Sequence, residues 1–508
     1  MMFSEKDIPK NSDCAGASYS SHADADRADA SCPSRTGAEN TQRMIICLDD
    51  TDSNDGMCTT YLASLLMDEL TAAGLGHVDG FPHLIRLNPT IPYKTRGNAA
   101  LGFILRIGGA GLGCDEVFGK IREHVCARIS SFAMTDCEKT NPGAVFIPDS
   151  LFGSVREPLR AHFRKALTDV VSVEDAFSLA GSLGIPYFYL KCGRGLIGAL
   201  AAAGSLLSLN DSGIPDFDHT FEYLAYRRRD AWGTKRHVSK ESLFRADAET
   251  YPDTWDTVDL TGKPKPLVVC VPGSPDPVLY GIRGRSPEAV GKAASFIESE
   301  PVERFRIFLT NQGTDAHLIP VSRISEMRPF HSYRISGTVC RPPEMIEGGH
   351  AIFSISDDSG SEIACAAYEP TGNFRKIVRQ LRTGDLVTVS GSLKENDEKN
   401  GRLTLNIEKL TIAETVPEIV RENPSCPVCG RKTESAGAGQ GFRCRRCRTH
   451  AGTKTEKVID RSFLCGRYEV PPSARRHLSK PLIRNLSGSE SDTAGSAEDV
   501  PSYPSRRF

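Results

Sequence analysis

The stretch MIICLDDTDSNDGMCTTYL, residues 44–62, decides the first folded unit of this chain. Its apolar start, residues 44–48, predicts a buried strand, and the apolar spacing of residues 58–74 predicts an amphipathic helix. A glycine and two threonines lie at the start of that helix, directly after an acidic turn. A strand end so rich in charge and hydroxyl groups indicates a functional site. The acids are Asp49, Asp50, Asp52 and Asp55.

Several carboxylates at one strand end repel each other, so one of them must be protonated or displaced unless a cation neutralises the cluster. Mg²⁺ relieves this repulsion and gives such a site affinity for phosphate groups. We therefore expect Asp50 and Asp52 to be Mg²⁺ ligands, with Asp49 beside them. Capping of the following helix explains one of the acids but not four.

A phosphotransferase of the haloacid-dehalogenase type is the obvious alternative, because its strand ends in Asp-x-Asp-x-Thr/Val. Residues 50–53 fit the first places of that pattern, but Asn54 stands where threonine or valine is expected. The later lysine and acidic pair of that class are not apparent in the required order.

Composition limits the possible classes of protein. The 508 residues predict roughly three to five domains. Lys and Arg number 62 against 64 Asp and Glu, so any nucleic-acid surface has to be local. No apolar run reaches the ~18–20 residues that span a bilayer, and the N-terminus lacks the apolar core of a secretory signal. Most of the 16 cysteines are scattered singly, which indicates a reduced, cytoplasmic protein in which only clustered cysteines bind metal.

Strand and helix signals alternate from residue 44 to about residue 212 and again from 220 to 310, which predicts two α/β or α+β sandwiches. Residues 1–42 and the tail after about residue 487 contain few large aliphatic residues, so we expect both to be disordered. The glycine-rich GGAGLG, residues 108–113, lacks the spacing of a phosphate loop and is expected to be a connector.

From residue 331 the pattern becomes all-β. Five short alternating segments, with a helix over 374–382 between the third and the fourth, predict an OB-fold, a small barrel that commonly binds oligonucleotides. Two Cys-x-x-Cys knuckles follow, separated by 14 residues. Four thiolates suit tetrahedral Zn²⁺ and leave no open position for catalysis, so we expect structural zinc. The ligands are Cys426, Cys429, Cys444 and Cys447.

Positive charge is concentrated around these knuckles. Residues 421–484 hold 15 Lys and Arg against 5 Asp and Glu. One group of cations lies on the second knuckle, and a second group lies in the segment SARRHLSKPLIR, residues 473–484. Beside an OB-fold and a zinc ribbon, this excess predicts binding to a phosphate backbone. The residues are Arg443, Arg445, Arg446 and Arg448 in the first group, and Arg475, Arg476, Lys480 and Arg484 in the second.

Two further segments are candidates for nucleotide binding. In CGRGLIG, residues 192–198, Gly193 and Gly195 would let the backbone approach a phosphate to which Arg194 donates hydrogen bonds. A tight helix–strand packing turn explains these glycines equally well. In RRRDAWGTKRHV, residues 227–238, Lys235 and Arg236 suit a triphosphate or RNA, although an exposed basic loop is the simpler explanation.

Seven motifs in this order resemble the archaeal synthetases that make 2-agmatinylcytidine in the CAU-anticodon isoleucine tRNA. The resemblance covers about residues 44–484, and the acidic strand end followed by Gly-Met-Cys-Thr-Thr is its most specific part. The motifs are DDTDSNDGMCTTYL (49–62), TNPG (140–143), WGTKR (232–236), GIRG (281–284), TNQGTDAH (310–317), YRISGTV (333–339) and CPVCG with CRRC (426–430 and 444–447).

The resemblance implies a multidomain α+β protein with four folded domains. It also implies that Asp49, Asp50 and Asp52 organise Mg²⁺ and the triphosphate of ATP, and that Thr59 is autophosphorylated. The assignment of Arg194, Lys235 and Arg236 to ATP is our own inference. The expected parts are a disordered extension (1–42), a kinase-like α/β ATP-binding catalytic domain (43–212), a ferredoxin-like α+β domain (213–322), an OB-fold β-barrel (328–416), a zinc ribbon (422–466) and a basic C-terminal segment with a disordered tail (467–508).

The family uses ATP to join agmatine to the 2-carbon of the wobble cytidine, so that the tRNA decodes AUA. Phosphorylation of the cytosine 2-carbonyl oxygen would turn a poor leaving group into a good one. The expected partners are therefore this tRNA, agmatine and ATP, with Mg²⁺ and structural Zn²⁺, and we expect neither a membrane nor a protein partner. Two alternatives stay open: an OB-fold and zinc-ribbon nucleic-acid-binding protein with a degenerate enzyme half, and a haloacid-dehalogenase-like phosphatase.

Overall fold

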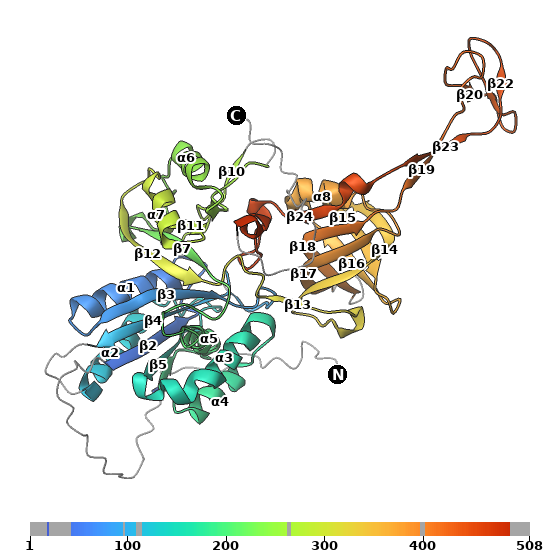
Figure 1. Cartoon of the computed structure of the whole chain (residues 1–508). Coiled ribbons are helices and arrows are strands. Elements are labelled where there is room, and N and C mark those ends of the chain that lie inside the picture. Colours follow the sequence, from blue (N-terminus) through green and yellow to red (C-terminus); the bar gives the residue numbers. More distant parts are fainter. Residues whose placement is uncertain are drawn as a thin grey trace.

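The computed structural model describes residues 18–19, 42–94, 97–107, 114–261, 266–396 and 402–487. The segments expected to be disordered lie almost wholly outside these ranges, and so does the glycine-rich connector at 108–113. Within the ranges, no helix is both long and apolar enough to cross a membrane. Two α+β units lie next to each other, a β-barrel lies beside them, and a small ribbon projects from the barrel on a stalk (Figure 1).

The predicted strand at the start of the acidic motif, β2 (Gln42–Asp49), lies inside the sheet of the first unit. Its neighbours β4 and β5 both pair with it in antiparallel fashion. The remaining strands extend the sheet on either side. The order is β1 (Ser18–Tyr19), β6 (Tyr187–Tyr189), β5 (Gly143–Pro148), β2, β4 (Ala99–Ile107) and β3 (His77–Arg86).

Both faces of β2 are covered by helices, which is why its sequence is a continuous apolar run. Met44, Ile46 and Leu48 pack with residues of α1 (Thr59–Ala72) and α2 (Cys114–Phe132). Ile45 and Cys47 face the other side. There they share a core with α3 (Phe152–Thr168), α4 (Val173–Ser182) and α5 (Gly195–Leu206). The helix expected over 58–74 is α1.

The second unit has the βαββαβ connectivity and the strand order of a ferredoxin-like fold, so that prediction is confirmed. A short strand, β10 (Leu267–Val268), pairs with β9 (Val258–Asp259) outside the main sheet. The main elements are β7 (Thr220–Arg227), α6 (Lys240–Thr250), β8 (Thr254–Trp255), β11 (Val278–Gly284), α7 (Pro287–Ser295) and β12 (Val302–Thr310).

The alternation of strands and helices predicted two separate sandwiches, but the two units share one sheet. Strand β12 pairs in parallel with β3, so one ten-stranded sheet runs through both units (Figure 1). Asn311 extends the junction: its Oδ1 accepts from Arg86 N at 2.8 Å, and its Nδ2 donates to Arg86 O at 2.9 Å. This pairing links segments more than two hundred residues apart, which local periodicity cannot reveal.

The predicted OB-fold is confirmed. Its five strands close into a barrel because β14 pairs with both β15 and β17. The helix between the third and fourth strands, α8 (Asn373–Val378), is shorter than the expected 374–382. Two short strands add to the barrel, β13 (Leu318–Pro320) and β24 (Gly466–Glu469). The barrel strands are β14 (Ser332–Ile346), β15 (His350–Ser356), β16 (Glu362–Ala367), β17 (Leu386–Asn396) and β18 (Arg402–Glu414).

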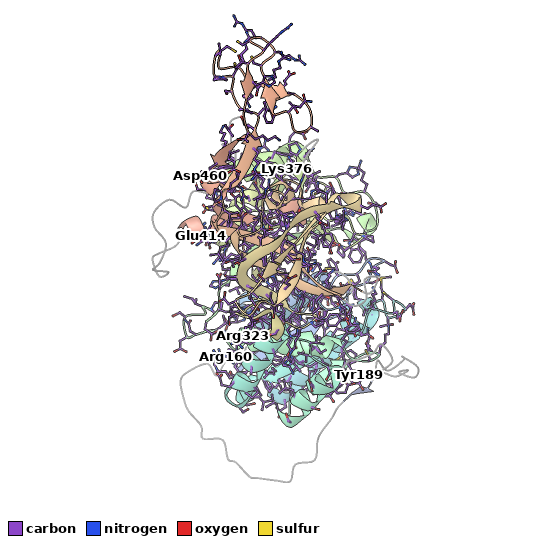
Figure 2. All side chains as sticks on the ribbon, turned by 90° about the vertical axis from the view of Figure 1, so that its right-hand side faces the viewer. Arg160, Tyr189, Arg323, Lys376, Glu414 and Asp460 are labelled. Carbon is purple, nitrogen blue, oxygen red and sulfur yellow. The ribbon has the colours of Figure 1, made fainter. Side chains whose placement is uncertain are left out.

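The ribbon is inserted between β18 and β24. Strands β19 (Glu418–Glu422) and β23 (Thr455–Ile459) form its two-stranded stalk. Glu414 and Asp460, which flank the ribbon in sequence, lie on the barrel side of the stalk in Figure 2, and the ribbon projects beyond them. Residues 466–487, called here the return segment, then run back between the barrel and the α+β units (Figure 1). The tip strands are β20 (Glu434–Ser435), β21 (Phe442–Arg443) and β22 (His450–Ala451).

Candidate active site

The acidic motif begins where β2 ends. Asp49 is the last residue of β2, and Asp50 has a φ of 57°, in the left-handed region that non-glycine residues rarely adopt. The Asp50 amide donates a hydrogen bond to Asp49 Oδ1 at 2.6 Å. Such strained backbone persists where the surrounding structure fixes it, and it clusters at functional sites. Asp55, by contrast, is exposed and its amide donates to Ser53 Oγ within the same turn.

Helix α5 lies directly against this strand end because glycines remove the side chains between them. A Cβ on Gly198 would lie 1.9 Å from Asp49 Oδ2, and a Cβ on Gly195 would lie 2.5 Å from Asp49 O. A Cβ on Gly143, in β5, would lie 2.2 Å from Leu196 N. Gly195 therefore serves helix–strand packing, which was one of the two explanations for the CGRGLIG segment.

Gly193 serves the local turn. Its φ is 67°, and a Cβ there would approach the rings of Phe177 and Tyr189 to 3.0 Å. The structure therefore explains both glycines of the motif through packing and backbone geometry. Their contact with ATP stays a prediction.

Arg194 is the cation that the structure brings to the acids. Its Nε and Nη2 lie 2.9 and 2.8 Å from Asp50 Oδ2. Burial raises the pKa of Asp50 well above its usual range, and the Arg194 charge opposes that effect. Burial also raises the pKa of Asp49 to about 8; the Asp50 amide and Arg194 oppose this, whereas the charge of Asp52 adds to it. The Arg194 charge thus offsets part of the mutual repulsion of these carboxyl groups.

Binding of Mg²⁺ by Asp50 and Asp52 stays a prediction, and a nucleotide would have to complete the coordination of the ion. Mg²⁺ in proteins is commonly held by one or two carboxylates, waters and substrate phosphates rather than by a complete protein cage. Asp49, Asp50 and Asp52 do not form a complete cage. In the described part of the chain, only the four cysteines of the ribbon gather three or more such ligand atoms within 4.8 Å of each other.

Thr59 is the first residue of α1 and faces the acidic turn. Its Oγ1 accepts hydrogen bonds from Thr51 N at 3.3 Å and from Thr51 Oγ1 at 3.1 Å. Thr51 stands between Asp50 and Asp52, so these bonds hold the Thr59 hydroxyl against the acidic turn. The Thr60 hydroxyl lies instead 3.0 Å from Cys58 Sγ. The two adjacent threonines therefore have different surroundings.

A cavity of about 300 Å³ lies between the two α+β units. The first unit contributes Asp52 and Thr59 to its wall, and the second unit contributes Glu222 on β7 and Arg283 on β11. The joined sheet explains this arrangement, because β3 and β12 bring the two units edge to edge. Of the residues predicted at the strand end, Asp52 and Thr59 line this cavity, whereas Asp49, Asp50 and Arg194 are not among its lining residues.

Arg236 supports the wall of this cavity. Its guanidinium donates to the carbonyl oxygens of Val278 at 2.8 Å, Pro272 at 2.8 Å and Asp276 at 2.9 Å, and all three acceptor residues line the cavity. The Lys235 side chain is exposed, and its carbonyl accepts from the buried Arg227. The structure therefore does not place either cation beside Asp50, as it does Arg194, and their role with ATP stays a prediction.

The four predicted zinc ligands meet at the tip of the ribbon. All four sulfur atoms lie within 4.8 Å of one another, and Cys429 Sγ and Cys444 Sγ are 3.6 Å apart. Thiolates bound at ~2.3 Å around tetrahedral Zn²⁺ lie ~3.8 Å from each other, so the cluster fits that ion. Because the protein supplies four ligands, zinc here would be structural.

The two groups of cations near the ribbon lie in different environments. Those of the second knuckle are exposed on the ribbon, as a nucleic-acid surface requires: Arg443, Arg445, Arg446 and Arg448. The expectation for the second group is wrong for Arg475, whose side chain is only 4% exposed and pairs with Asp256 and Glu469.

The other cations of this second group are also used within the molecule. Arg484 pairs with Asp218 at 2.8 Å and lies over the Trp255 ring. Lys480 also pairs with Asp218, at 3.3 Å, and Arg476 donates to Ser392. Asp218 and Ser392 come from distant segments, so the sequence around these cations gave no sign of them. The basic stretch 473–484 thus anchors the return segment.

Sequence reasoning missed most of the far wall of the cavity. Arg283 stands in the quoted GIRG motif but was given no role, and Glu222, on β7, was not singled out. Arg86 and His477, which also line the cavity, carried no signal at all. Their importance follows only from the pairing of distant segments.

Together these features define a class of protein: a multidomain α+β enzyme with an acidic, threonine-bearing site and two modules suited to nucleic acid. Family models match the chain in the same order. They are the TiaS TCKD domain (residues 45–192), the TiaS FLD domain (193–317), the OB-fold nucleic acid binding domain (333–413) and the TiaS C-terminal zinc ribbon domain (423–463). The models divide the first two domains just before α5, whereas we expected the division after it, at residue 212.

The chain belongs to the TiaS family, the 2-agmatinylcytidine synthetases that act on an isoleucine tRNA. It is 53% identical over 441 residues to the synthetase of Methanosarcina mazei, covering 87% of this chain and 97% of that protein. It is 48% identical over 447 residues to that of Archaeoglobus fulgidus, covering 88% and 99%.

Solved structures agree with this assignment. The crystal structure of apo TiaS, an agmatidine synthetase for isoleucine tRNA, is 46% identical, with a TM-score of 0.74 and coverage of 87% of this chain and 97% of that one. The complex of TiaS with its isoleucine tRNA, AMPCPP and agmatine is 44% identical, with a TM-score of 0.71 and the same coverage.

Proposed function

We propose that this protein uses ATP to join agmatine to the 2-carbon of the wobble cytidine in the CAU-anticodon isoleucine tRNA, in the cytoplasm. One observation carries the proposal. Asp52 and Thr59 line the cavity between the two α+β units, and the Asp50–Arg194 pair lies at the same strand end. The names of its relatives, and the TiaS structure with an isoleucine tRNA, an ATP analogue and agmatine, support the same substrates.

Each residue of the strand end has a role in this proposal. Asp50 and Asp52 would hold the Mg²⁺ that accompanies ATP, and the ion would neutralise the charge of the phosphates and of the acids themselves. Arg194 keeps Asp50 in place and adds positive charge where the triphosphate lies. Thr59, at the N-terminus of α1 and bonded to Thr51, accepts a phosphoryl group.

The tRNA reaction then takes place in the cavity. The wobble base leaves the anticodon stack to enter, because its 2-carbon is inaccessible within stacked bases. A phosphoryl group from ATP is transferred to the 2-oxygen: the new O–P bond forms as the P–O bond to the departing nucleotide breaks, and the 2-oxygen becomes part of a good leaving group. The agmatine amine bonds to C2, the C2–O bond breaks with its electron pair, phosphate departs, and a proton leaves the attacking nitrogen. The OB-fold and the exposed arginines of the ribbon hold the rest of the tRNA through its phosphates and loop bases.

One assay separates this function from its alternatives. Purified protein is incubated with labelled agmatine, ATP, Mg²⁺ and the CAU-anticodon isoleucine tRNA transcript. We expect label on the RNA only when ATP is present, and none on a transcript whose wobble cytidine is replaced by uridine. Binding of the tRNA without ATP consumption would support the degenerate nucleic-acid-binding protein. Release of phosphate from phosphate esters without RNA would support the phosphatase.

A further inference from the structure

The return segment completes the wall of the catalytic cavity. Its His477 lines the cavity together with residues of both α+β units. The backbone there is held tightly: His477 O accepts from Gly313 N at 2.8 Å, and Leu478 O accepts from Thr314 N at 3.1 Å and Asp315 N at 2.8 Å. A residue that follows the zinc ribbon in sequence is thus fixed inside the cavity of the first two domains.

The contacts of His477 determine which ring nitrogen carries the proton. Two groups face His477 Nδ1, Arg283 Nη2 at 2.7 Å and Gln312 Oε1 at 3.0 Å. A hydrogen on Nδ1 would point at a guanidinium that can only donate and that makes the shorter contact, so Nδ1 accepts from Arg283. Burial, together with the charges of Arg86, Arg283 and Lys94, holds the pKa of His477 well below its usual range. The ring is therefore neutral, and its Nε2 carries a hydrogen and acts as a donor.

Arg86 supplies a second donor at the same place. Its backbone is fixed by the two hydrogen bonds to Asn311, and its Nε has no hydrogen-bond partner in the described part of the chain. The position that a Cβ would take on Gly97 lies 2.6 Å from Arg86 Nη1 and 3.3 Å from His477 Nε2. These two nitrogens are therefore at most about 6 Å apart, so one anionic oxygen or two oxygens of one group can accept from both.

We infer that Arg86 and His477 form an anion subsite for the phosphoryl group carried by the activated cytidine, with Gly97 providing the space beside it. The inference rests on the proposed function. Arg283 is a positioning residue, since it acts through Nδ1 of His477. Thr59 lines the same cavity, so a phosphoryl group on the cytosine 2-oxygen can face the phosphoryl-transfer residues and this subsite together.

Donors of this kind would accelerate the second step, in which agmatine displaces phosphate from C2, because they stabilise the departing phosphate. When the agmatine nitrogen bonds to C2, the C2–O bond breaks and its electron pair stays on the departing phosphate. A fixed guanidinium and a neutral imidazole N–H stabilise that charge without giving up a proton. The guanidinium end of agmatine would be repelled by Arg86, so it must lie elsewhere in the cavity.

The test uses the full-length protein with tRNA, ATP, Mg²⁺ and agmatine, and inorganic phosphate as the probe of the subsite. The variants are Arg86→Gln, His477→Phe and Gly97→Ala, with His477→Gln to restore an N–H donor. Arg245→Gln is the matched control, because Arg245 is an exposed arginine that pairs with Glu298 on the outside of the second unit. Inhibition by phosphate, the rate of agmatidine formation, tRNA affinity and phosphorylation of Thr59 with ATP alone are measured for each.

We expect inorganic phosphate to inhibit the unmodified enzyme and Arg245→Gln equally. In Arg86→Gln and His477→Phe, the phosphate inhibition constant should rise at least about tenfold and agmatidine formation should slow by about 100-fold. Thr59 phosphorylation and tRNA affinity should stay within about threefold, and His477→Gln should recover part of the rate. Unchanged phosphate inhibition in both variants would overturn the inference, as would a loss explained entirely by weaker tRNA binding. Failure of the unmodified enzyme to make agmatidine would instead contradict the proposed function.

Discussion

His317 and Glu408 form a buried pair that joins the second α+β unit to the OB barrel. His317 Nε2 lies 3.0 Å from Glu408 Oε1, and the two side chains are 0% and 4% exposed. The pair stands beside a second link between the same parts, the ion pair of Lys409 with Asp315. The OB barrel and the second α+β unit are thereby joined by two side-chain contacts.

This pair predicts a dependence of stability on pH. Burial acts to raise the pKa of Glu408, but the charge and hydrogen bond of His317, with Arg476 and Lys409, lower it to about 2. A carboxyl group whose pKa is lowered by folding stabilises the fold above its unfolded pKa and loses that contribution as the pH falls. We expect a loss of roughly 3 kcal/mol between about pH 4.5 and pH 2, because one pKa unit corresponds to ~1.4 kcal/mol.

Thermal unfolding measured from pH 6 to pH 3 checks this expectation in the unmodified protein and in Glu408→Gln. The variant should be less stable at pH 6 and should change less with pH. Glu414→Gln, at an exposed position of β18, is the control and should follow the unmodified protein. If the stability of Glu408→Gln and that of the unmodified protein changed equally with pH, the His317–Glu408 pair would make no contribution to the pH dependence of stability.

Gly198→Ala should disable the strand end without unfolding the chain. The added Cβ would lie 1.9 Å from Asp49 Oδ2, so either α5 or the carboxyl group has to move. Displacement of catalytic groups by about 1 Å commonly costs ~100-fold in rate, and we expect that loss in Thr59 phosphorylation. Gly181→Ala in α4 is the matched control, since nothing lies within 4 Å of its Cβ position. Equal activity of the two variants would contradict the packing account of Gly198.

The local elements of this fold were predictable from sequence. The apolar run ending at Asp49 and the spacing after Cys58 predicted β2 and α1, and the paired knuckles predicted the cysteine cluster. In each case, the residues that determine the structure are neighbours in the chain. The acids and Thr59 belong to the same short motif, so their proximity was also predictable.

The far side of the cavity was not predictable, because it depends on contacts between distant segments. Arg86 and His477 are separated by about 390 residues and meet only after β3 pairs with β12 and the return segment folds back. Arg475 was assigned to RNA for the same reason: its partner Asp256 lies 219 residues earlier in the chain and is invisible in the local charge pattern. Composition measures the charge of a segment but not the charge of what it packs against.

Replacement of Arg194 should weaken the ATP-dependent step. Arg194→Met leaves the Asp50 carboxyl buried without its cation, and removal of one partner of a buried pair is strongly unfavourable. We expect the rate of Thr59 phosphorylation to fall by about 100-fold in Arg194→Met. Arg194→Lys retains the charge but not the two-nitrogen contact, so its rate should lie between those of Arg194→Met and the unmodified protein. Arg164→Met, on the exposed face of α3, should behave like the unmodified protein. A normal rate of Thr59 phosphorylation in Arg194→Met would show that Arg194 has no role in this step.

Loss of the zinc ribbon should separate tRNA binding from phosphoryl transfer. Cys426→Ser removes one of four thiolates, so the ribbon should lose zinc and its fold. We expect tRNA affinity to fall at least about tenfold, with Thr59 phosphorylation by ATP alone unchanged. Cys465→Ser, at an exposed cysteine outside the cluster, is the control. Zinc content is measured by metal analysis and tRNA affinity by filter binding; full zinc occupancy in Cys426→Ser would contradict the ligand assignment.

The most direct test of the central claim is mass analysis of the wobble nucleoside after reaction with ATP, Mg²⁺ and agmatine. The unmodified protein should convert cytidine to agmatidine at that position. Thr59→Ala should lose both this product and the phosphothreonine, whereas Thr60→Ala, with its hydroxyl turned to Cys58, should retain both. Unmodified cytidine in every reaction, or full agmatidine formation by Thr59→Ala, would contradict the account.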